Sequence, residues 1–331
     1  MVFSLIICTY QRPSALLNLL QSVAKQSLYP DEILIIDGSF DDATKNVIET
    51  NQFKNLLYYK VDDQNRGLTK QRNFGISKLN SISEIVCFLD DDVILNRDYF
   101  KNLIITYNLF PDALAVGGYI INEVKWVNEI QSQKANMFCI DGFCRTESTR
   151  FKARKKLALD ADVLPGFLPN FSHGRSVGYL PPSNKIYQVE LFMGGVSSYK
   201  TEVFSKLQFS TYFEGYGLYE DADFCLRLSK IGKLYVNTAA QLEHHHHPSG
   251  RPNQYQYGKM VLRNGWYVWR VKNSNPKFKD KVKWHAISLL LTAIRFTNVF
   301  TTKQKKQAFT ETLGRISGWL SLFFNKPKVT L

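Results

Sequence analysis

Three consecutive aspartates, Asp90, Asp91 and Asp92, follow an apolar run that is typical of a buried strand. One acid at this point would cap the next helix, whose N-terminal dipole favours a negative charge by about 0.3–1 kcal/mol. Three adjacent carboxylates repel one another, and a divalent cation would compensate them because Mg²⁺ and Mn²⁺ prefer oxygen ligands. The triplet taken by itself therefore favours a metal site over a helix cap.

The elements that would position this triplet alternate along residues 1–120. Short β-branched runs are separated by amphipathic segments, a pattern typical of βαβ units around a mostly parallel sheet. Strands are expected at residues 2–8, 32–37, 56–61, 84–89 and 114–120, and helices at 13–26, 41–51, 67–80 and 97–109. Such a sheet binds its ligand at the carboxyl ends of its strands, where Thr9, Asp37 and the triplet fall.

The second half of the chain is less regular. Residues 121–190 are rich in Lys, Arg, Pro and Gly, which indicates an insertion of long loops where a second substrate could dock. Regular patterns return at 186–200, followed by a helix to about 207, a helix at 220–231 and a strand at 233–243. From about residue 254 the pattern is helical to the end.

Six motifs occur in the order and at about the spacing of a known family. They are ICTYQRP, IIDGSFDD, NRGLTKQRNFGI, FLDDDV, MGGVSSYK and YEDADFCLRLSKIGK. Over residues 2–251 the chain thus resembles the family 2 glycosyltransferases with a GT-A fold. The resemblance implies an α/β fold with a Rossmann-like, mostly parallel sheet flanked by helices, in a domain of residues 1–253. Its nucleotide-binding half would be 1–120 and its acceptor-binding and catalytic-base half 121–253, with a helical C-terminal extension at 254–331.

The resemblance also implies a nucleotide-sugar site. Its residues would be Thr9, Tyr10, Arg12, Asp37, Arg72, Asp90, Asp91, Gly194 and Gly195. Asp37 resembles the family's acid that accepts a hydrogen bond from the base, and a carboxylate can accept one from a pyrimidine N3–H. The residues alone leave other interpretations open. Thr9 could be a strand-end cap and Asp37 part of an Asx-turn. Arg72 could be a solvated helix residue, and the two glycines could form a simple turn.

The same resemblance assigns metal and proton chemistry. Asp92 would bind a divalent metal. His244, expected at the end of the strand 233–243, could complete the metal site, because a neutral imidazole can bind Mn²⁺, or could touch the diphosphate. An ordinary structural role for His244 stays open. Asp221 in YEDAD resembles the base that removes the acceptor's hydroxyl proton, with Glu220 as runner-up and Asp223 as a structural neighbour. Without the resemblance, this motif would be interpreted as the acidic first turn of a helix.

Charge and cysteine content narrow the class of protein. The net charge of +13 suits nucleic acid, phosphorylated small molecules or an anionic membrane, but no RNA- or DNA-reading motif accompanies it. Five scattered cysteines favour reduced thiols in a cytosolic chain, although Cys139 and Cys144 could pair or bind metal. The N-terminus lacks the basic segment of a secretory signal, and the apolar stretch 286–296 falls short of the ~20 residues that span a bilayer.

The C-terminal region holds the remaining candidates. We expect His245 to His247 in a loop and Arg251 near a phosphate. Two amphipathic segments follow, with the apolar residues Trp284, Ile287, Leu291 and Ile294 in the first and Phe309, Leu313, Ile316, Leu320 and Phe323 in the second. These helices would pack on the catalytic domain or a partner subunit, or would contact an anionic membrane through their basic flanks.

Together these observations predict a Mn²⁺- or Mg²⁺-dependent inverting glycosyltransferase. It would move a sugar from a UDP- or dTDP-linked donor to a hydroxyl of a glycan or lipid-linked glycan, in bacterial-type surface polysaccharide synthesis. The expected location is the cytoplasm or the inner face of the cell membrane. One alternative is a sugar-phosphate nucleotidyltransferase, against which stands the lack of a Gly-rich N-terminal phosphate loop. The other is a non-catalytic nucleotide- or glycan-binding protein with structural acids.

Overall fold

The chain forms two compact units, each assembled from two separate stretches of sequence. The computed structural model describes residues 1–128, 136–213, 215–246 and 252–329. The first unit comprises Met1–Trp126 and Ser176–Gly250, and the second comprises Val127–Arg175 and Arg251–Leu331. Residues 127–175 thus group with the C-terminal helices, whereas the functional division expected at residue 253 stays a prediction.

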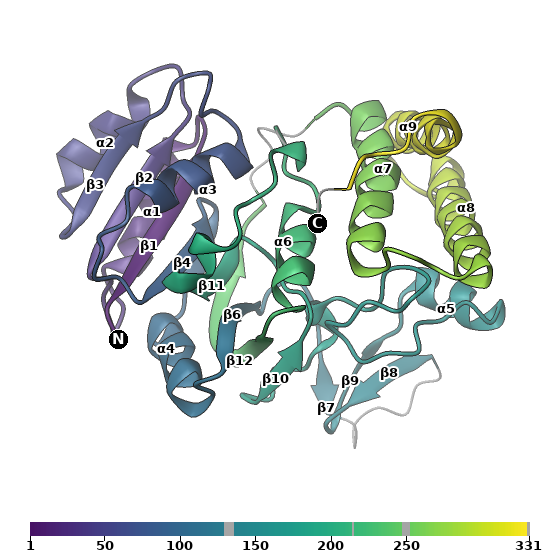
Figure 1. The fold of residues 1–331 in the computed structure, drawn as a ribbon, viewed down its shortest axis with the longest axis horizontal. Helices are drawn as coiled ribbons and strands as arrows, with labels where there is room; N and C mark the ends of the chain where they lie inside the picture. Colours follow the sequence, from purple (N-terminus) through teal and green to yellow (C-terminus); the bar gives the residue numbers. More distant parts are fainter. Residues whose placement is uncertain (129–135, 214, 247–251, 330–331) are drawn as a thin grey trace. The chain divides into compact units, whose positions relative to one another are not determined.

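The first unit is built around one mixed sheet (Figure 1). Its described strands lie in the order β10 (Ile186–Val189), β12 (Lys233–His244), β6 (Ala113–Ile120), β11 (Val196–Lys200), β4 (Ile85–Asp90), β1 (Phe3–Thr9), β2 (Glu32–Asp37) and β3 (Leu56–Lys60). A short strand, β5 (Val93–Leu95), pairs with the end of β12. The strands from β4 to β3 are parallel, as are β6 and β12, while β11 joins the two groups in antiparallel orientation.

Helices cover both faces of this sheet (Figure 1). One core contains side chains of α1 (Pro13–Val23), α2 (Ala43–Asn51) and α4 (Tyr99–Leu109), and the other contains side chains of α3 (Leu68–Ser77) and α6 (Glu220–Leu228). Successive side chains of a strand point to opposite faces, so Ile7 packs in the first core and Ile6 in the second. The predicted alternation of strands and helices over residues 1–120 is confirmed, with some helix ends shifted by a few residues.

Residues 121–190 contain short elements where long loops were expected. They are β7 (Val127–Asn128), β8 (Met137–Ile140), β9 (Phe143–Thr146), α5 (Thr149–Lys156), a 3-10 turn at Val177–Tyr179, and β10. Strands of two to four residues are too short to show a clear alternation of apolar and polar positions. The helix expected up to residue 207 is a 3-10 turn, Thr201–Ser205.

The expectation of reduced thiols is wrong for one pair of cysteines. Cys139 on β8 and Cys144 on β9 form a disulfide, while Cys8, Cys87 and Cys225 are free. The two bonded residues lie directly opposite each other across a hairpin, with Cα atoms 4.1 Å apart. The hairpin turns through Asp141 and Gly142, both with positive φ, as expected of an Asp-Gly turn. Cysteine spacing and composition do not reveal such a strand register.

The second unit contains the small sheet β7-β9-β8, the helix α5 and three long C-terminal helices. These helices, α7 (Gln254–Lys272), α8 (Phe278–Thr301) and α9 (Lys305–Phe324), confirm the predicted helical pattern from about residue 254. Their core contains Leu262, Trp266, Trp269, Trp284 and Leu322. Along the described chain no helix has the length and apolar character needed to cross a bilayer.

Glycines allow α7 and α9 to approach each other closely. A Cβ atom on Gly258 would lie 2.1 Å from the carbonyl oxygen of Glu311, and one on Gly314 would lie 2.0 Å from that of Tyr255. Backbone atoms cannot move away from such a contact without moving the helix. The packing of these two helices therefore depends on residues that lack a side chain.

Replacing Gly314 with alanine should destabilise the second unit, because α7 and α9 would have to separate. We expect the free energy of unfolding to fall by about 1–3 kcal/mol. Urea denaturation followed by tryptophan fluorescence measures this change, since four tryptophans lie in or against the helical core. Gln307→Ala, at an exposed position of the same helix, is the control. Unchanged stability of Gly314→Ala would contradict the close helix contact.

Candidate active site

Thr9, Asp37 and Asp90, three of the residues expected to bind the nucleotide, lie at the carboxyl ends of neighbouring parallel strands. The strand register pairs Thr9 on β1 with Asp37 on β2, and Cys8 with Asp90 on β4. The Thr9 hydroxyl donates a hydrogen bond of 2.7 Å to Oδ2 of Asp91. Three strands thus bring ICTYQRP, IIDGS and the aspartate triplet to one edge of the sheet.

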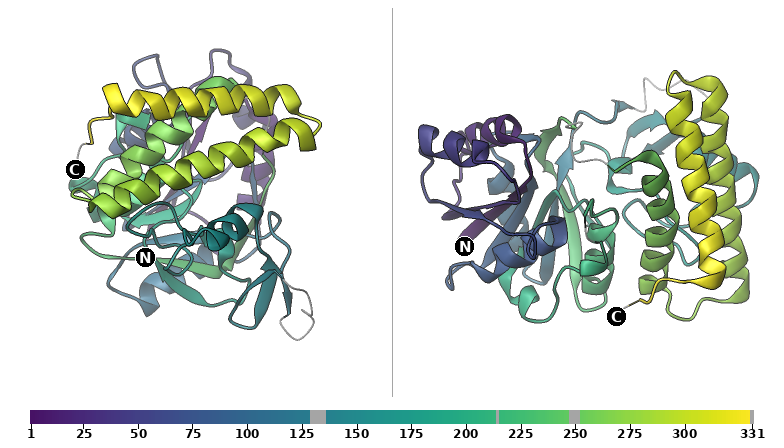
Figure 2. Two further views of the ribbon diagram at one scale, coloured as in Figure 1. Left: turned by 90° about the vertical axis from the view of Figure 1, so that its right-hand side faces the viewer. Right: turned by 90° about the horizontal axis from the view of Figure 1, so that it is seen from above.

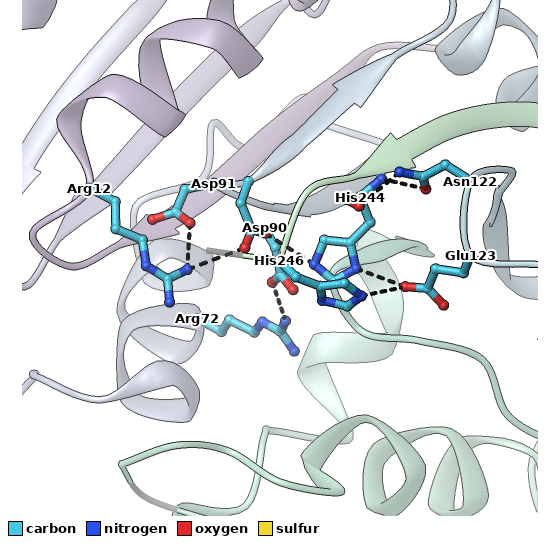
Figure 3. Close-up of polar contacts among 9 residues, drawn as sticks. Arg12, Arg72, Asp90, Asp91, Asn122, Glu123, His244 and His246 are labelled. Carbon is cyan, nitrogen blue, oxygen red and sulfur yellow. Dashed lines mark hydrogen bonds and ion pairs between the residues drawn. The ribbon is translucent and has the colours of Figure 1, made fainter. Parts of the chain in front are cut away.

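Basic side chains from other elements offset part of the triplet's charge (Figure 3). Nη1 of Arg12 lies 3.0 Å from Oδ1 of Asp91 and 3.6 Å from Oδ2 of Asp92. Burial raises the pKa of Asp91 to about 6, while Arg12 and the hydrogen bond from Thr9 oppose that rise. Asp91 is therefore engaged by protein groups, whereas the side chain of Asp90 is 41% exposed.

Arg72 links the triplet to the N-terminus of α6. Its guanidinium is buried, makes a close ion pair with Oε1 of Glu220 and lies 3.7 Å from Oδ1 of Asp90. The interpretation of Arg72 as a solvated helix residue is therefore wrong. Burial raises the pKa of Glu220 to about 8, with Arg72 opposing the rise and Asp221 and Asp90 adding to it. The second oxygen of Glu220 accepts no hydrogen bond from the described residues.

Asp221 is held by backbone groups rather than by a cation. Its Oδ2 accepts a hydrogen bond of 3.2 Å from the N–H of Gly194, and its Oδ1 accepts one of 2.7 Å from the N–H of Ala222. Burial raises the pKa of Asp221 above its ordinary value, and these two hydrogen bonds oppose the rise. The side chain is partly exposed, unlike that of Glu220. Its carboxylate is thus oriented and accessible.

The glycine pair in MGGV lies between Asp90 of the triplet and Glu220 of α6. A Cβ atom on Gly194 would lie 2.6 Å from Oε1 of Glu220, and one on Gly195 would lie 2.1 Å from Oδ2 of Asp90. The carbonyl oxygen of Gly195 also accepts the N–H of Asp90 at 3.0 Å. The glycines therefore let the β11 segment approach the acids more closely than any other residue would.

Asp90, Asp92 and His244 form a group that can hold a metal ion. One ligand atom from each lies within 4.8 Å of the other two. His244 comes next to the triplet because β12 pairs antiparallel with β5, and the N–H of His245 donates to the carbonyl of Asp92 at 2.9 Å. Two carboxylates and an imidazole are suitable ligands for Mn²⁺. The donor set thus fits the divalent ion that the sequence predicts.

The family model for glycosyl transferase family 2 matches residues 4–193 of the chain, more than half of its length. The chain belongs to glycosyltransferase family 2. Its inverting stereochemistry is a separate matter and stays a prediction.

Relatives agree with this membership, and a solved structure shares the fold. The chain is 28% identical over 130 residues to a glucosyl-dolichyl phosphate glucuronosyltransferase of Haloferax volcanii, covering 38% of this chain and 40% of that protein. It is 29% identical over 104 residues to the O-antigen chain rhamnosyltransferase RfbN of Salmonella typhimurium, covering 31% and 32%. Each match thus covers less than half of the relative.

Residues 1–349 of Staphylococcus aureus TarS share the fold with a TM-score of 0.53 at 15% identity, over 97% of this chain and 80% of that one. The predicted GT-A fold is confirmed.

Glu123 is a site residue that the motifs of this family 2 chain do not reveal. Its Oε1 lies 3.2 Å from Nδ1 of His244 and 3.0 Å from Nε2 of His246 (Figure 3). Burial would lower the pKa of His244, but hydrogen bonds to Asp92 and Glu123 outweigh burial and raise that pKa to about 10. Glu123 follows β6, the parallel neighbour of β12, so its contact with His244 comes from a strand pairing that no local sequence pattern reveals.

The contacts described for Asp37 and Tyr10 are with residues outside the aspartate triplet. The buried carboxylate of Asp37 accepts the N–H of Ser39 at 2.8 Å, an Asx-turn, and the hydroxyl of Tyr58 at 2.9 Å. Tyr58 is a second residue that the sequence analysis missed. Tyr10 packs edge-on against Phe40, with ring centroids 6.2 Å apart. The roles assigned to Asp37 and Tyr10 in nucleotide binding stay predictions.

Three further expectations concern neighbouring residues. Asp223, expected to be structural, is buried and pairs with Arg227 at 2.7 Å on the same helix. His247 and Arg251 lie outside the described residues. The expected contact of Arg251 with phosphate therefore stays a prediction.

Replacing Arg72 with methionine should leave Glu220 as a buried acid without a counter-charge. We expect a loss of about 3–5 kcal/mol in the free energy of unfolding at neutral pH, measured by urea denaturation. The deficit should grow as the pH rises, because at lower pH Glu220 can take up a proton and lose its charge. Adding Glu220→Gln to the same chain is the matched control and should recover much of the loss. A single variant as stable as wild type at pH 9 would refute this account.

Proposed function

We propose that this chain is a metal-dependent inverting glycosyltransferase. It would transfer a sugar from a nucleoside diphosphate sugar, UDP- or dTDP-linked, to a hydroxyl group of a glycan or lipid-linked glycan. The observation that carries the proposal is the position of Arg72, whose guanidinium contacts both Asp90 of the triplet and Glu220 of α6. A donor's diphosphate and the base that activates its acceptor must lie within one site, and Arg72 joins the residues suited to both tasks.

The diphosphate end of the site would be formed by the triplet and its partners. Asp90, Asp92 and His244 would hold a divalent ion, with Arg12 and Arg72 close to the same carboxylates. When bound, the ion would neutralise the negative charge that develops on the departing nucleoside diphosphate. Arg12 and Arg72 supply fixed positive charge in the same region, which favours an anionic ligand.

The nucleoside would lie along the ends of β1, β2 and β4. Thr9, Asp37 and Asp91 occupy those ends. Asp37 already accepts one hydrogen bond on each carboxylate oxygen, but each oxygen can accept a second one. A uracil or thymine N3–H is a suitable donor for that position, which supports a pyrimidine nucleotide. Tyr10 and Arg12, on the segment after β1, would border the same ligand.

Asp221 is the better candidate for the catalytic base. It is partly exposed and its carboxylate is oriented by two backbone N–H groups, whereas Glu220 is buried and paired with Arg72. Asp221 would take the proton of the acceptor hydroxyl as its oxygen forms a bond to the anomeric carbon. The bond between that carbon and the phosphate oxygen breaks on the opposite face, which inverts the configuration. Holding donor and acceptor in this geometry would supply most of the rate.

The acceptor class follows from the relatives' names and is part of the proposal. One relative is named for glucosyl-dolichyl phosphate and another for an O-antigen chain. We therefore propose a glycan or lipid-linked glycan acceptor and a role in surface polysaccharide synthesis at the inner face of the cell membrane.

The test of the function is a screen of nucleotide sugars. We expect one UDP- or dTDP-sugar, together with Mn²⁺ or Mg²⁺, to raise the melting temperature and to be hydrolysed slowly to the nucleoside diphosphate. Asp221→Asn should abolish turnover and leave donor protection intact, because the amide cannot accept the proton. Asp223→Asn is the matched control on the same helix. Failure of every nucleotide sugar to protect the protein, or full turnover by Asp221→Asn, would refute the proposal.

Metal binding gives a second test that does not require turnover. Asp92→Ala should abolish Mn²⁺ binding, and Glu123→Ala should weaken it by about 10–100-fold, because residues that orient a ligand contribute on that scale. Electron paramagnetic resonance of free Mn²⁺ measures both effects. Glu49→Ala, an exposed acid of α2, is the control. Unchanged Mn²⁺ affinity in Asp92→Ala would show that the triplet does not bind the metal.

A further inference from the structure

Two helices of the second unit, α8 and α9, expose many large apolar side chains. Among the described residues 24 large apolar side chains are exposed, and eleven of them lie on these two helices. Soluble monomers rarely expose contiguous apolar patches larger than a few hundred Å². This concentration indicates a surface that contacts an apolar partner.

On α8 the exposed apolar residues form one stripe. They are spaced by four or seven residues, which places them on the same side of a helix. The stripe consists of Phe278, Val282, Leu289, Phe296 and Phe300. Trp284 and Ile287, on the opposite side of α8, are buried. The helix therefore has one apolar face in the core of the unit and a second that is exposed.

A matching stripe runs along α9. Its residues are spaced by three or four positions and are Phe309, Leu313, Ile316, Leu320 and Phe323. The glycines that contact α7 lie on the other side of the helix. The exposed stripe is thus not the surface on which α9 packs.

The two stripes meet where the helices contact each other. α8 and α9 run side by side and antiparallel (Figure 2). The ring of Phe323 stacks on His285 at 5.8 Å between centroids, and Nε1 of Trp319 donates to Nδ1 of His285 at 3.1 Å. His285 is three residues from Val282 and four from Leu289, so Phe323 extends the stripe of α8. We call the ten stripe residues together the α8–α9 face.

Lysines lie at both ends of the α8–α9 face. Over residues 277–329 basic residues outnumber acidic ones eleven to two, and one of the acids, Glu311, is buried between Arg295 and Arg315. Lys279 and Lys281 at the start of α8 lie at the same end of the antiparallel pair as Lys326 after α9. The turn between the helices carries Lys303, Lys305 and Lys306. Apolar side chains bordered by lysines suit an anionic lipid surface, because the apolar side chains can enter the acyl region while the lysines contact the headgroups.

We infer that the α8–α9 face binds the surface of an anionic lipid bilayer. The phenylalanine and leucine side chains enter the boundary between headgroups and acyl chains, and the lysines bind lipid phosphates. The helices lie along the membrane, since neither can cross it. Charge selects lipid over a second copy of this chain, because two such faces would bring their lysines together. The inference does not depend on the proposed catalytic function.

Sedimentation with vesicles tests this inference on the full chain. Wild-type protein should bind vesicles of equal parts phosphatidylcholine and phosphatidylglycerol. Phe300→Glu combined with Leu320→Glu should lower the bound fraction about tenfold or more, because both charges would enter the apolar layer. The control is Ile82→Glu with Leu109→Glu, at positions that are 63% and 62% exposed in the first unit. Melting curves establish that both double variants are folded.

A second variant keeps the test decisive if the first does not fold. Replacing Lys303, Lys305 and Lys306 with glutamine should lower the affinity for anionic vesicles severalfold and make binding less sensitive to salt. Absence of wild-type binding, equal binding to pure phosphatidylcholine vesicles, or undiminished binding by the folded apolar variant would overturn the inference. So would a wild-type dimer in light scattering that the apolar variant converts to monomer.

Discussion

A single buried guanidinium, that of Arg72, is the interaction on which the candidate site depends. A charge in the protein interior is costly unless it is paired. Arg72 meets this requirement with Glu220 and Asp90, and lies over the rings of Phe88 and Phe209. Arg72 lies on α3, and its two acidic partners lie on α6 and β4, so the pairing ties the N-terminus of α6 to the aspartate triplet. The proposed base and the metal-binding acids consequently keep a defined relation to each other.

The rest of the site consists of acids whose charge is only partly offset. Asp91 is satisfied by Thr9 and Arg12, whereas Asp90 remains partly exposed. Asp92 shares Arg12 with Asp91 and faces His244. Such residual charge is held in place before any ligand arrives, because each carboxylate is anchored by strand register or by a neighbouring side chain. Fixed groups of this kind need little reorganisation during the reaction, which is how a preorganised site stabilises the charge that develops in a transition state.

The two units combine different chemistry. The first unit holds the acids and arginines of the candidate site, at the ends of buried strands, on the segments that follow them, and on α3 and α6. The second unit holds a tryptophan core, two glycine-mediated helix contacts and the α8–α9 face with its lysines. Much of the net charge of +13 comes from the second unit, so a global count of charges says little about the acidic site in the first.

The sequence by itself determined the α/β class, the alternating elements of residues 1–120, the C-terminal helices and the motifs that carry Asp90 to Asp92 and Asp221. Those features depend on local periodicity and on short motifs, which can be recognised without knowing the fold. Tertiary structure alone decided that Glu123 contacts His244, that Tyr58 contacts Asp37 and that Cys139 lies opposite Cys144. It also decided that residues 127–175 join the C-terminal helices. These contacts depend on which strands are neighbours and in what register, and the free energy that selects a register comes from packing across the whole sheet rather than from any one segment.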